Sequence, residues 1–155
     1  NWEEIKLSEG RESVLDGVPH NLPALQRAHR LQEKAAKVGF DWEMKEDVWK
    51  KVIEEIEEMH EIENIKTQTS ETKDIKELNL KLEKEVGDVF FAMVNYARFL
   101  GINPEDALRL TNEKFIKRFN YVQQKVKETG KAINESNLEE MDKYWNESKK
   151  LNGFD

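Results

Sequence analysis

The longest regular stretch of the sequence decides the fold class. Residues 75–101 read IKELNLKLEKEVGDVFFAMVNYARFLG. The apolar side chains recur at steps of three or four residues, at Leu78, Leu82, Val86, Val89, Met93, Tyr96 and Leu100. This spacing is the period of an amphipathic α-helix, and Gly101 marks its end. The stretch therefore predicts a long helix over about 75–100, with one apolar face directed at a core.

Four further stretches show helical spacing or helix-end residues. They cover about 21–38, 46–63, 104–130 and 138–150. Asn21 is expected to cap the first, with Pro23 in its first turn, and Asn137 with Glu140 predicts a capping box for the last. Residues 64–75 are polar and are interpreted as a loop. We expect an all-α fold, a four- to five-helix bundle with shallow crossing angles.

The sparse glycines and prolines suggest where the helical domain begins and ends. Residues 1–20 lack a sustained period and are interpreted as a linker or arm. The helical domain is expected over 21–150, and 151–155 form a short tail. The chain begins with Asn1 rather than Met, so we expect it to be a piece of a longer protein.

The composition describes an acidic chain without cysteine. Its 155 residues include 25 Lys and Arg against 32 Asp and Glu, a formal net charge of −7. This balance argues against binding to duplex DNA, because phosphate binding needs a basic surface. The absence of cysteine fits a reducing compartment. No apolar run approaches the roughly 20 residues of a membrane span, and no signal-peptide pattern opens the sequence. We expect a cytoplasmic domain that binds neither nucleic acid nor membranes.

Acidic side chains lie one step before the apolar stripe on two of the predicted helices. Glu55 and Glu58 occupy this row on the second helix, and Glu85 and Asp88 occupy it on the third. Residues three or four apart share one face of a helix. Antiparallel packing of the two helices would therefore bring four carboxylates together across a groove.

Such a cluster needs compensation, because carboxylates a few ångströms apart repel one another. Either protons or a cation must neutralise them. Oxygen ligands without cysteine favour a hard divalent ion, Mg²⁺ first and Mn²⁺ second. Lys114 and Arg118 lie one step before the apolar stripe of the fourth helix, as the acidic residues do on theirs, and could approach the same groove.

Two other interpretations of the acidic residues stay open. An acidic helix face is most often simply solvated, so the chain could be a helical interaction module without catalysis. Glu57 and His60 form one Glu-x-x-His pair, as in di-iron carboxylate bundles. That class needs the motif on two helices, and the third helix offers no histidine.

The order of the acidic residues resembles the signature of a known enzyme family. Residues 54–58 read EEIEE and residues 85–88 read EVGD, with 26 residues between them. This set resembles the EExxE…ExxD signature of the MazG-type all-α nucleoside triphosphate pyrophosphohydrolases. Other stretches that look like this family lie at 12–19, 22–42, 95–98 and 112–119. The resemblance covers about 12–146, most of the chain.

The resemblance implies hydrolysis of nucleoside and deoxynucleoside triphosphates to the monophosphate and pyrophosphate with Mg²⁺, for which Mn²⁺ can substitute. By position, the metal ligands are Glu55, Glu58, Glu85 and Asp88, and Glu54 is a supporting residue or base. The candidate phosphate-binding residues are Lys81, Lys114 and Arg118, and the candidate nucleotide-binding residues are Trp42, Asn112 and Trp145. The family also implies a homodimer, and the stretch 12–19 precedes the second of two tandem domains in it, so a companion domain is expected on the N-terminal side.

Overall fold

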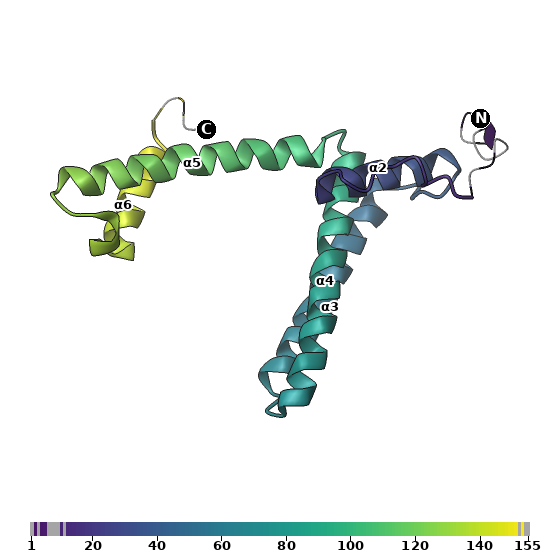
Figure 1. Cartoon of the computed structure of the whole chain (residues 1–155), viewed down its shortest axis with the longest axis horizontal. Helices are drawn as coiled ribbons and strands as arrows, with labels where there is room; N and C mark the ends of the chain where they lie inside the picture. The colour runs from purple at the N-terminus through teal and green to yellow at the C-terminus, as the bar shows by residue number, and fades with distance from the viewer. Residues whose placement is uncertain (1, 3, 6–9, 11, 152, 154–155) are drawn as a thin grey trace. The chain divides into compact units, whose positions relative to one another are not determined.

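The computed structural model describes residues 2, 4–5, 10, 12–151 and 153. Within these residues the secondary structure is helical, and no strand is present. The α-helices labelled in Figure 1 are α2 (Ala24–Lys37), α3 (Lys45–Thr67), α4 (Thr72–Phe99), α5 (Pro104–Glu128) and α6 (Leu138–Ser148). A short 3-10 helix, η1 (Ile133–Glu135), precedes α6. The all-α prediction is confirmed, while the expected homodimer stays a prediction. None of the described helices combines the length and apolar character that crossing a membrane requires.

The chain divides into two compact units, Asn1–Glu105 and Asp106–Asp155. This division does not test the predicted limits of the helical domain, at residues 21 and 150, which stay predictions. Each unit is described by itself below.

The centre of the first unit is an antiparallel hairpin of α3 and α4, which run side by side in Figure 1. The buried side chains of Val48 and Val52 come from α3, and those of Ala92 and Val94 come from α4. Trp49 near the start of α3 packs against Tyr96 near the end of α4, with ring centroids 5.1 Å apart. These contacts hold the two helices together as an antiparallel pair, although Met93 and Leu100 of the predicted apolar stripe remain 43% and 46% exposed.

The predicted loop at 64–75 is wrong in its extent, because only residues 68–71 connect the two helices. The hydroxyl of Thr67 donates to the carbonyl of Glu63 at 3.0 Å, and that of Thr69 donates to Ile65 at 2.7 Å. Hydroxyl groups can bond to the preceding helical turn while remaining exposed. The polar residues at 64–67 and 72–75 are therefore helical, although their composition suggested a loop.

Helix α2 packs against α4 and begins later than the sequence suggests. Pro23 occupies the N-cap position with no side-chain cap, so the predicted cap at Asn21 is wrong. Proline lacks an N–H and has an extended ψ of 142° here, which places the first helical turn directly after it. Gly39 ends the helix as predicted, with a positive φ of 93° that disfavours side chains bearing a Cβ.

The second unit contains most of α5 together with η1 and α6. Val122 and Val126 of α5 are buried, and so is Ser148 at the end of α6. The Asn137 side chain accepts a hydrogen bond from the backbone N–H of Glu140 at 2.9 Å, as the predicted cap requires. The Glu140 carboxylate bonds to Lys131 instead of returning to the N-cap.

Candidate active site

Three carboxylates meet across the α3–α4 hairpin. Glu55 and Glu58 lie one helical turn apart on α3, and Glu85 lies on α4. One oxygen from each carboxylate lies within 4.8 Å of the corresponding oxygens of the other two. Antiparallel packing places the acidic rows, one step before each apolar stripe, on the same side of the hairpin. The proximity predicted from helical offset is therefore observed for these three residues, which we call the carboxylate cluster.

Two oxygens of the carboxylate cluster are buried and accept no hydrogen bond. Glu55 is 6% exposed, and its Oε1 lies 2.8 Å from Nζ of Lys51. Oε2 of Glu55 and Oε2 of Glu85 have no donor among the residues that the structure describes. Leaving a buried polar atom unpaired costs roughly 1–3 kcal/mol, and more if the group is charged. The cluster therefore holds two acceptors that a cation could satisfy.

The electrostatics of the cluster also favour a cation. The negative charge of Glu55 is the main cause that raises the pKa of Glu58 above its ordinary value, followed by burial and the charge of Glu85. The hydrogen bond from Lys51 to Glu55 raises the lysine pKa and keeps the ammonium charged. Within the part of the chain that the structure describes, Lys51 offsets one of the three carboxylate charges of the cluster. Carboxylate oxygens are preferred ligands of hard divalent ions, and the residues present fit Mg²⁺ or Mn²⁺.

The other predicted residues near the cluster lie on the same two helices. Asp88 is exposed one helical turn after Glu85, and its carboxylate is outside the group of three. Glu54 is exposed, and its Oε1 lies 3.5 Å from Nζ of Lys51. Lys81 is exposed one turn before Glu85. The roles of Asp88, Glu54 and Lys81 stay predictions.

Four predicted site residues belong to the second unit. Arg118 of α5 lies over the ring of Trp145 of α6, with its guanidinium carbon 5.8 Å from the centroid, and the Phe115 ring lies 5.5 Å from Trp145. Lys114 is half-buried one turn before Arg118, and Asn112 is exposed on the same helix. The structure brings Arg118 and Trp145 together within this unit. The predicted contacts of all four with phosphates or nucleoside stay predictions.

Trp42 lines a cleft of about 670 Å³ in the first unit. Its walls include the aromatic side chains of Phe40 and Phe91 and the polar side chains of Gln32 and Asn95. Sequence reasoning singled out Trp42 and missed Gln32, because only the packing of α2 on α4 brings that glutamine to the cleft. Lys51 was also missed as a site residue, although its spacing of three and four residues from Glu54 and Glu55 shows that they can pair.

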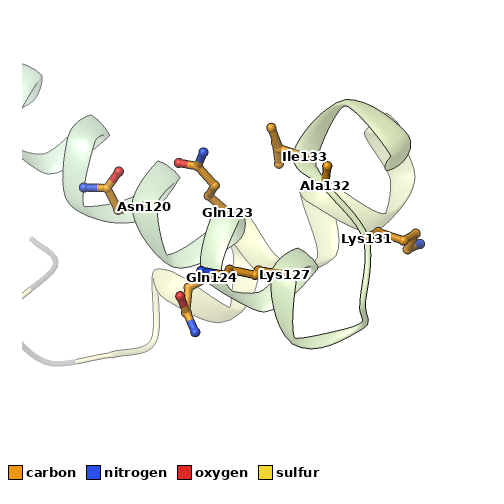
Figure 2. Close-up of a pocket in the computed structure, with 7 residues that line it drawn as sticks. All are labelled: Asn120, Gln123, Gln124, Lys127, Lys131, Ala132 and Ile133. Atoms are coloured by element: carbon orange, nitrogen blue, oxygen red, sulfur yellow. The ribbon is translucent and has the colours of Figure 1, made fainter.

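A second cavity, of about 550 Å³, lies in the second unit between the end of α5 and the segment before η1. Figure 2 shows the amides of Asn120 and Gln123 on one wall and Lys131 near the other end. The ammonium of Lys131 is bonded to Glu140 at 2.9 Å. None of the residues predicted for the site lines this cavity.

An all-α fold with a carboxylate cluster across a helical hairpin defines a class of helical proteins suited to divalent cations. Comparison with protein families identifies the class further, since residues 44–123 match the MazG nucleotide pyrophosphohydrolase domain. The match includes the whole α3–α4 hairpin and covers more than half of the chain. The chain therefore belongs to the MazG family, and the resemblance inferred from the signature is confirmed.

Curated relatives extend the similarity beyond this domain. The chain is 40% identical over 153 residues to the nucleoside triphosphate pyrophosphohydrolase of Escherichia coli K12, covering 96% of this chain and 55% of that protein. It is 37% identical over 156 residues to the MazG nucleoside triphosphate pyrophosphohydrolase/pyrophosphatase of Thermotoga maritima, covering 96% and 54%. The uncharacterized protein YabN of Bacillus subtilis is 49% identical over 152 residues, which cover 29% of its length. The chain spans about half the length of the two MazG relatives.

Proposed function

We propose that this chain hydrolyses nucleoside and deoxynucleoside triphosphates between the α and β phosphates, releasing the monophosphate and pyrophosphate. The observation that carries the proposal is the carboxylate cluster with its two buried, unpaired oxygens. The E. coli and T. maritima relatives are named nucleoside triphosphate pyrophosphohydrolases, which supports the same reaction.

Glu55, Glu58, Glu85 and Asp88 are the proposed ligands of Mg²⁺, with Mn²⁺ as a substitute. When bound, such an ion supplies positive charge against the triphosphate and acidifies coordinated water. The three clustered carboxylates come from two packed helices, so their positions are fixed before substrate binds. Asp88 lies one turn further along α4, at a spacing that keeps it on the same helix face as Glu85.

Glu54 is the proposed general base that accepts the proton of the attacking water. Lys51 reaches both Glu54 and Glu55, at 3.5 and 2.8 Å, and this holds the Glu54 carboxylate beside the cluster. A base next to the proposed ligands can orient a water in line with the phosphorus.

Cationic and aromatic residues are proposed to bind the rest of the nucleotide. Lys81, Lys114 and Arg118 would offset the charge of the departing pyrophosphate, because charge-assisted hydrogen bonds to phosphate are strong. The proposed nucleoside-binding residues are Trp42, Asn112 and Trp145. We also propose that the chain acts as a homodimer, as the family resemblance implies.

Product analysis tests the reaction. The protein is incubated with ATP or dTTP in the presence of Mg²⁺ and, separately, of EDTA, and the products are separated by anion exchange. The proposal predicts monophosphate and pyrophosphate with Mg²⁺, no diphosphate, and no turnover with EDTA. Formation of diphosphate and phosphate would contradict the cleavage position. Absence of turnover on every nucleotide would favour the non-catalytic helical module.

A further inference from the structure

Gln32 presents a buried hydrogen-bond acceptor whose orientation is fixed by α4. The residue is 7% exposed, and its Nε2 donates to the backbone carbonyl of Phe91 at 2.9 Å. A carbonyl can only accept a hydrogen bond, so the amide nitrogen must face Phe91 and the amide oxygen must face away from it. That oxygen, Oε1, has no donor among the described residues.

The surroundings of Gln32 point to a flat ligand with polar edges. Phe40, Trp42 and Phe91 line the same cleft of about 670 Å³ in the first unit. Aromatic side chains provide stacking surfaces for nucleobases. The cleft is large enough for a base, because ligand pockets commonly start at about 300 Å³.

A second amide in the cleft is also fixed in orientation. Oδ1 of Asn95 accepts hydrogen bonds from Nε and Nη2 of Arg98, at 3.0 and 2.9 Å, so its Nδ2 is the group left to donate. Arg98 in turn donates from Nη1 to Asp41 at 3.1 Å, which ties the turn that carries Phe40 and Trp42 to α4. The amides of Gln32 and Asn95 are therefore both oriented before a ligand arrives, as selective recognition requires.

We propose that Gln32 is a specificity-determining residue, whose Oε1 accepts a hydrogen bond from an N–H of a nucleobase held among the cleft aromatics. The proposal rests on the proposed function and deepens it. The Gln32 acceptor would select triphosphates whose base presents an amino or ring N–H donor at this position. A site with a buried acceptor rejects an analogue that lacks the donor, since the acceptor then stays unpaired.

Oε1 is buried in the structure, so a neighbouring side chain must move before a base can reach it. Phe40 is the most exposed of the three aromatic residues, at 82% compared with 44% for Trp42 and 48% for Phe91. Phe40 therefore has the most freedom of the three to reorient when a base enters the cleft.

Paired substrates that differ in one N–H test the proposal. ATP is compared with purine riboside triphosphate, which lacks the 6-amino group, and UTP is compared with N3-methyl-UTP, in which a methyl group replaces the hydrogen of the ring N–H. Wild type should show a kcat/KM about 10- to 100-fold lower for the analogue in at least one pair. The pair that responds shows whether an amino group or a ring N–H is bound.

Two variants locate the effect. Gln32→Met keeps the length of the side chain without its acceptor and should bring the ratio within the responsive pair close to one. Gln26→Met changes a half-buried glutamine on the same helix, outside the cleft, and should leave the ratio as in wild type. Equal kcat/KM within both pairs for wild type, or an unchanged ratio in Gln32→Met, would overturn the proposal.

Binding keeps this test separate from the test of hydrolysis. The same four nucleotides are titrated while tryptophan fluorescence is followed, and the ratio of Kd values should show the same pattern. Discrimination in binding without any hydrolysis would contradict the proposed reaction and support the role of Gln32. Hydrolysis of all four nucleotides with equal kcat/KM and equal Kd would overturn the role of Gln32 and leave the reaction standing.

Discussion

At the scale of single residues, the dominant feature is charge repulsion within the carboxylate cluster. Glu55, Glu58 and Glu85 place oxygens within 4.8 Å of one another, and Lys51 is the cation that contacts Glu55. Like charges at this distance oppose folding unless a proton or a cation intervenes. The cluster therefore reduces stability in the absence of metal, as we expect of the proposed metal site.

Glu58→Gln should stabilise the metal-free protein and abolish turnover. The pKa of Glu58 is raised, chiefly by the charge of Glu55. The folded state therefore favours the protonated form, and stability falls as pH rises from the ordinary value of 4.5 through the raised one. Thermal unfolding with EDTA should show a higher Tm for the variant than for wild type above this range and little difference below it. Glu57→Gln, an exposed neighbour, is the control; an equal gain in Tm from it would contradict the explanation.

Asp88→Asn should remove activity without harming the fold. The side chain is exposed, so its substitution creates no cavity and no buried unpaired group. If it is a metal ligand, kcat/KM should fall by at least about 100-fold, since even groups behind the ligands contribute 10- to 100-fold. Steady-state kinetics measures the loss of activity, and circular dichroism measures whether the fold is retained. Asp74→Asn, on the same helix, should retain activity. An active Asp88→Asn would exclude Asp88 as a ligand, and an unfolded one would assign it a structural role.

At the scale of elements, the α3–α4 hairpin holds the cluster in place. Val52 is fully buried between the helices, whereas its neighbour Ile53 is 38% exposed. Val52→Ala should lower the free energy of unfolding by about 2 kcal/mol, because two buried methyl groups are lost and a cavity remains. Ile53→Ala should cost clearly less. Urea denaturation measures both, and equal losses would contradict the assignment of the hairpin core.

The turn after α2 is held by the ion pair between Asp41 and Arg98, in which Nη1 of Arg98 lies 3.1 Å from Oδ2 of Asp41. The hydrogen bond from Arg98 is the main cause that lowers the pKa of Asp41, against the opposing effect of burial. Asp41→Asn should reduce stability by about 1–2 kcal/mol near pH 7, since bonds to charged groups are stronger than neutral ones. Because the folded-state pKa is depressed, the wild-type advantage is complete above the ordinary value of 3.8 and disappears as pH falls through the lowered value.

Urea denaturation across this pH range checks the Asp41 prediction. Asp106→Asn removes a mostly exposed pair with Arg109, at 3.0 Å, and should change stability by less than about 1 kcal/mol. An advantage of Asp41 that persists unchanged at acidic pH would show that the ion pair is not its source.

Helical periodicity predicted the elements better than it predicted their ends. The stripe from Leu78 to Leu100 located α4, and Gly39 located the end of α2. The connection between α3 and α4 was expected to be too long, because polar residues such as Thr67 can remain helical when their side chains are solvated or bonded to the previous turn. Residue type marks a helix end clearly only where a special backbone conformation is required.

At the scale of the whole molecule, the sequence predicted the proximity of the carboxylates that the consecutive helices α3 and α4 bring together. The offset of Glu55, Glu58 and Glu85 from their stripes is a local property, and antiparallel packing of consecutive helices is the simplest topology. The role of Gln32 depends on its hydrogen bond to Phe91, 59 residues away. No local pattern encodes that contact, so only the folded structure reveals the buried acceptor beside the cleft.

The central claim is that the carboxylate cluster binds the divalent ion on which hydrolysis depends. Mn²⁺ binding, followed by electron paramagnetic resonance, tests it without relying on turnover. The titration uses wild type, Glu85→Gln and Glu83→Gln, an exposed control on the same helix, each with an ATP analogue carrying a methylene between the α and β phosphates. We predict Mn²⁺ binding by wild type and Glu83→Gln and its loss, by about 10-fold or more in Kd, in Glu85→Gln. Equal Mn²⁺ affinity in all three proteins would contradict the claim.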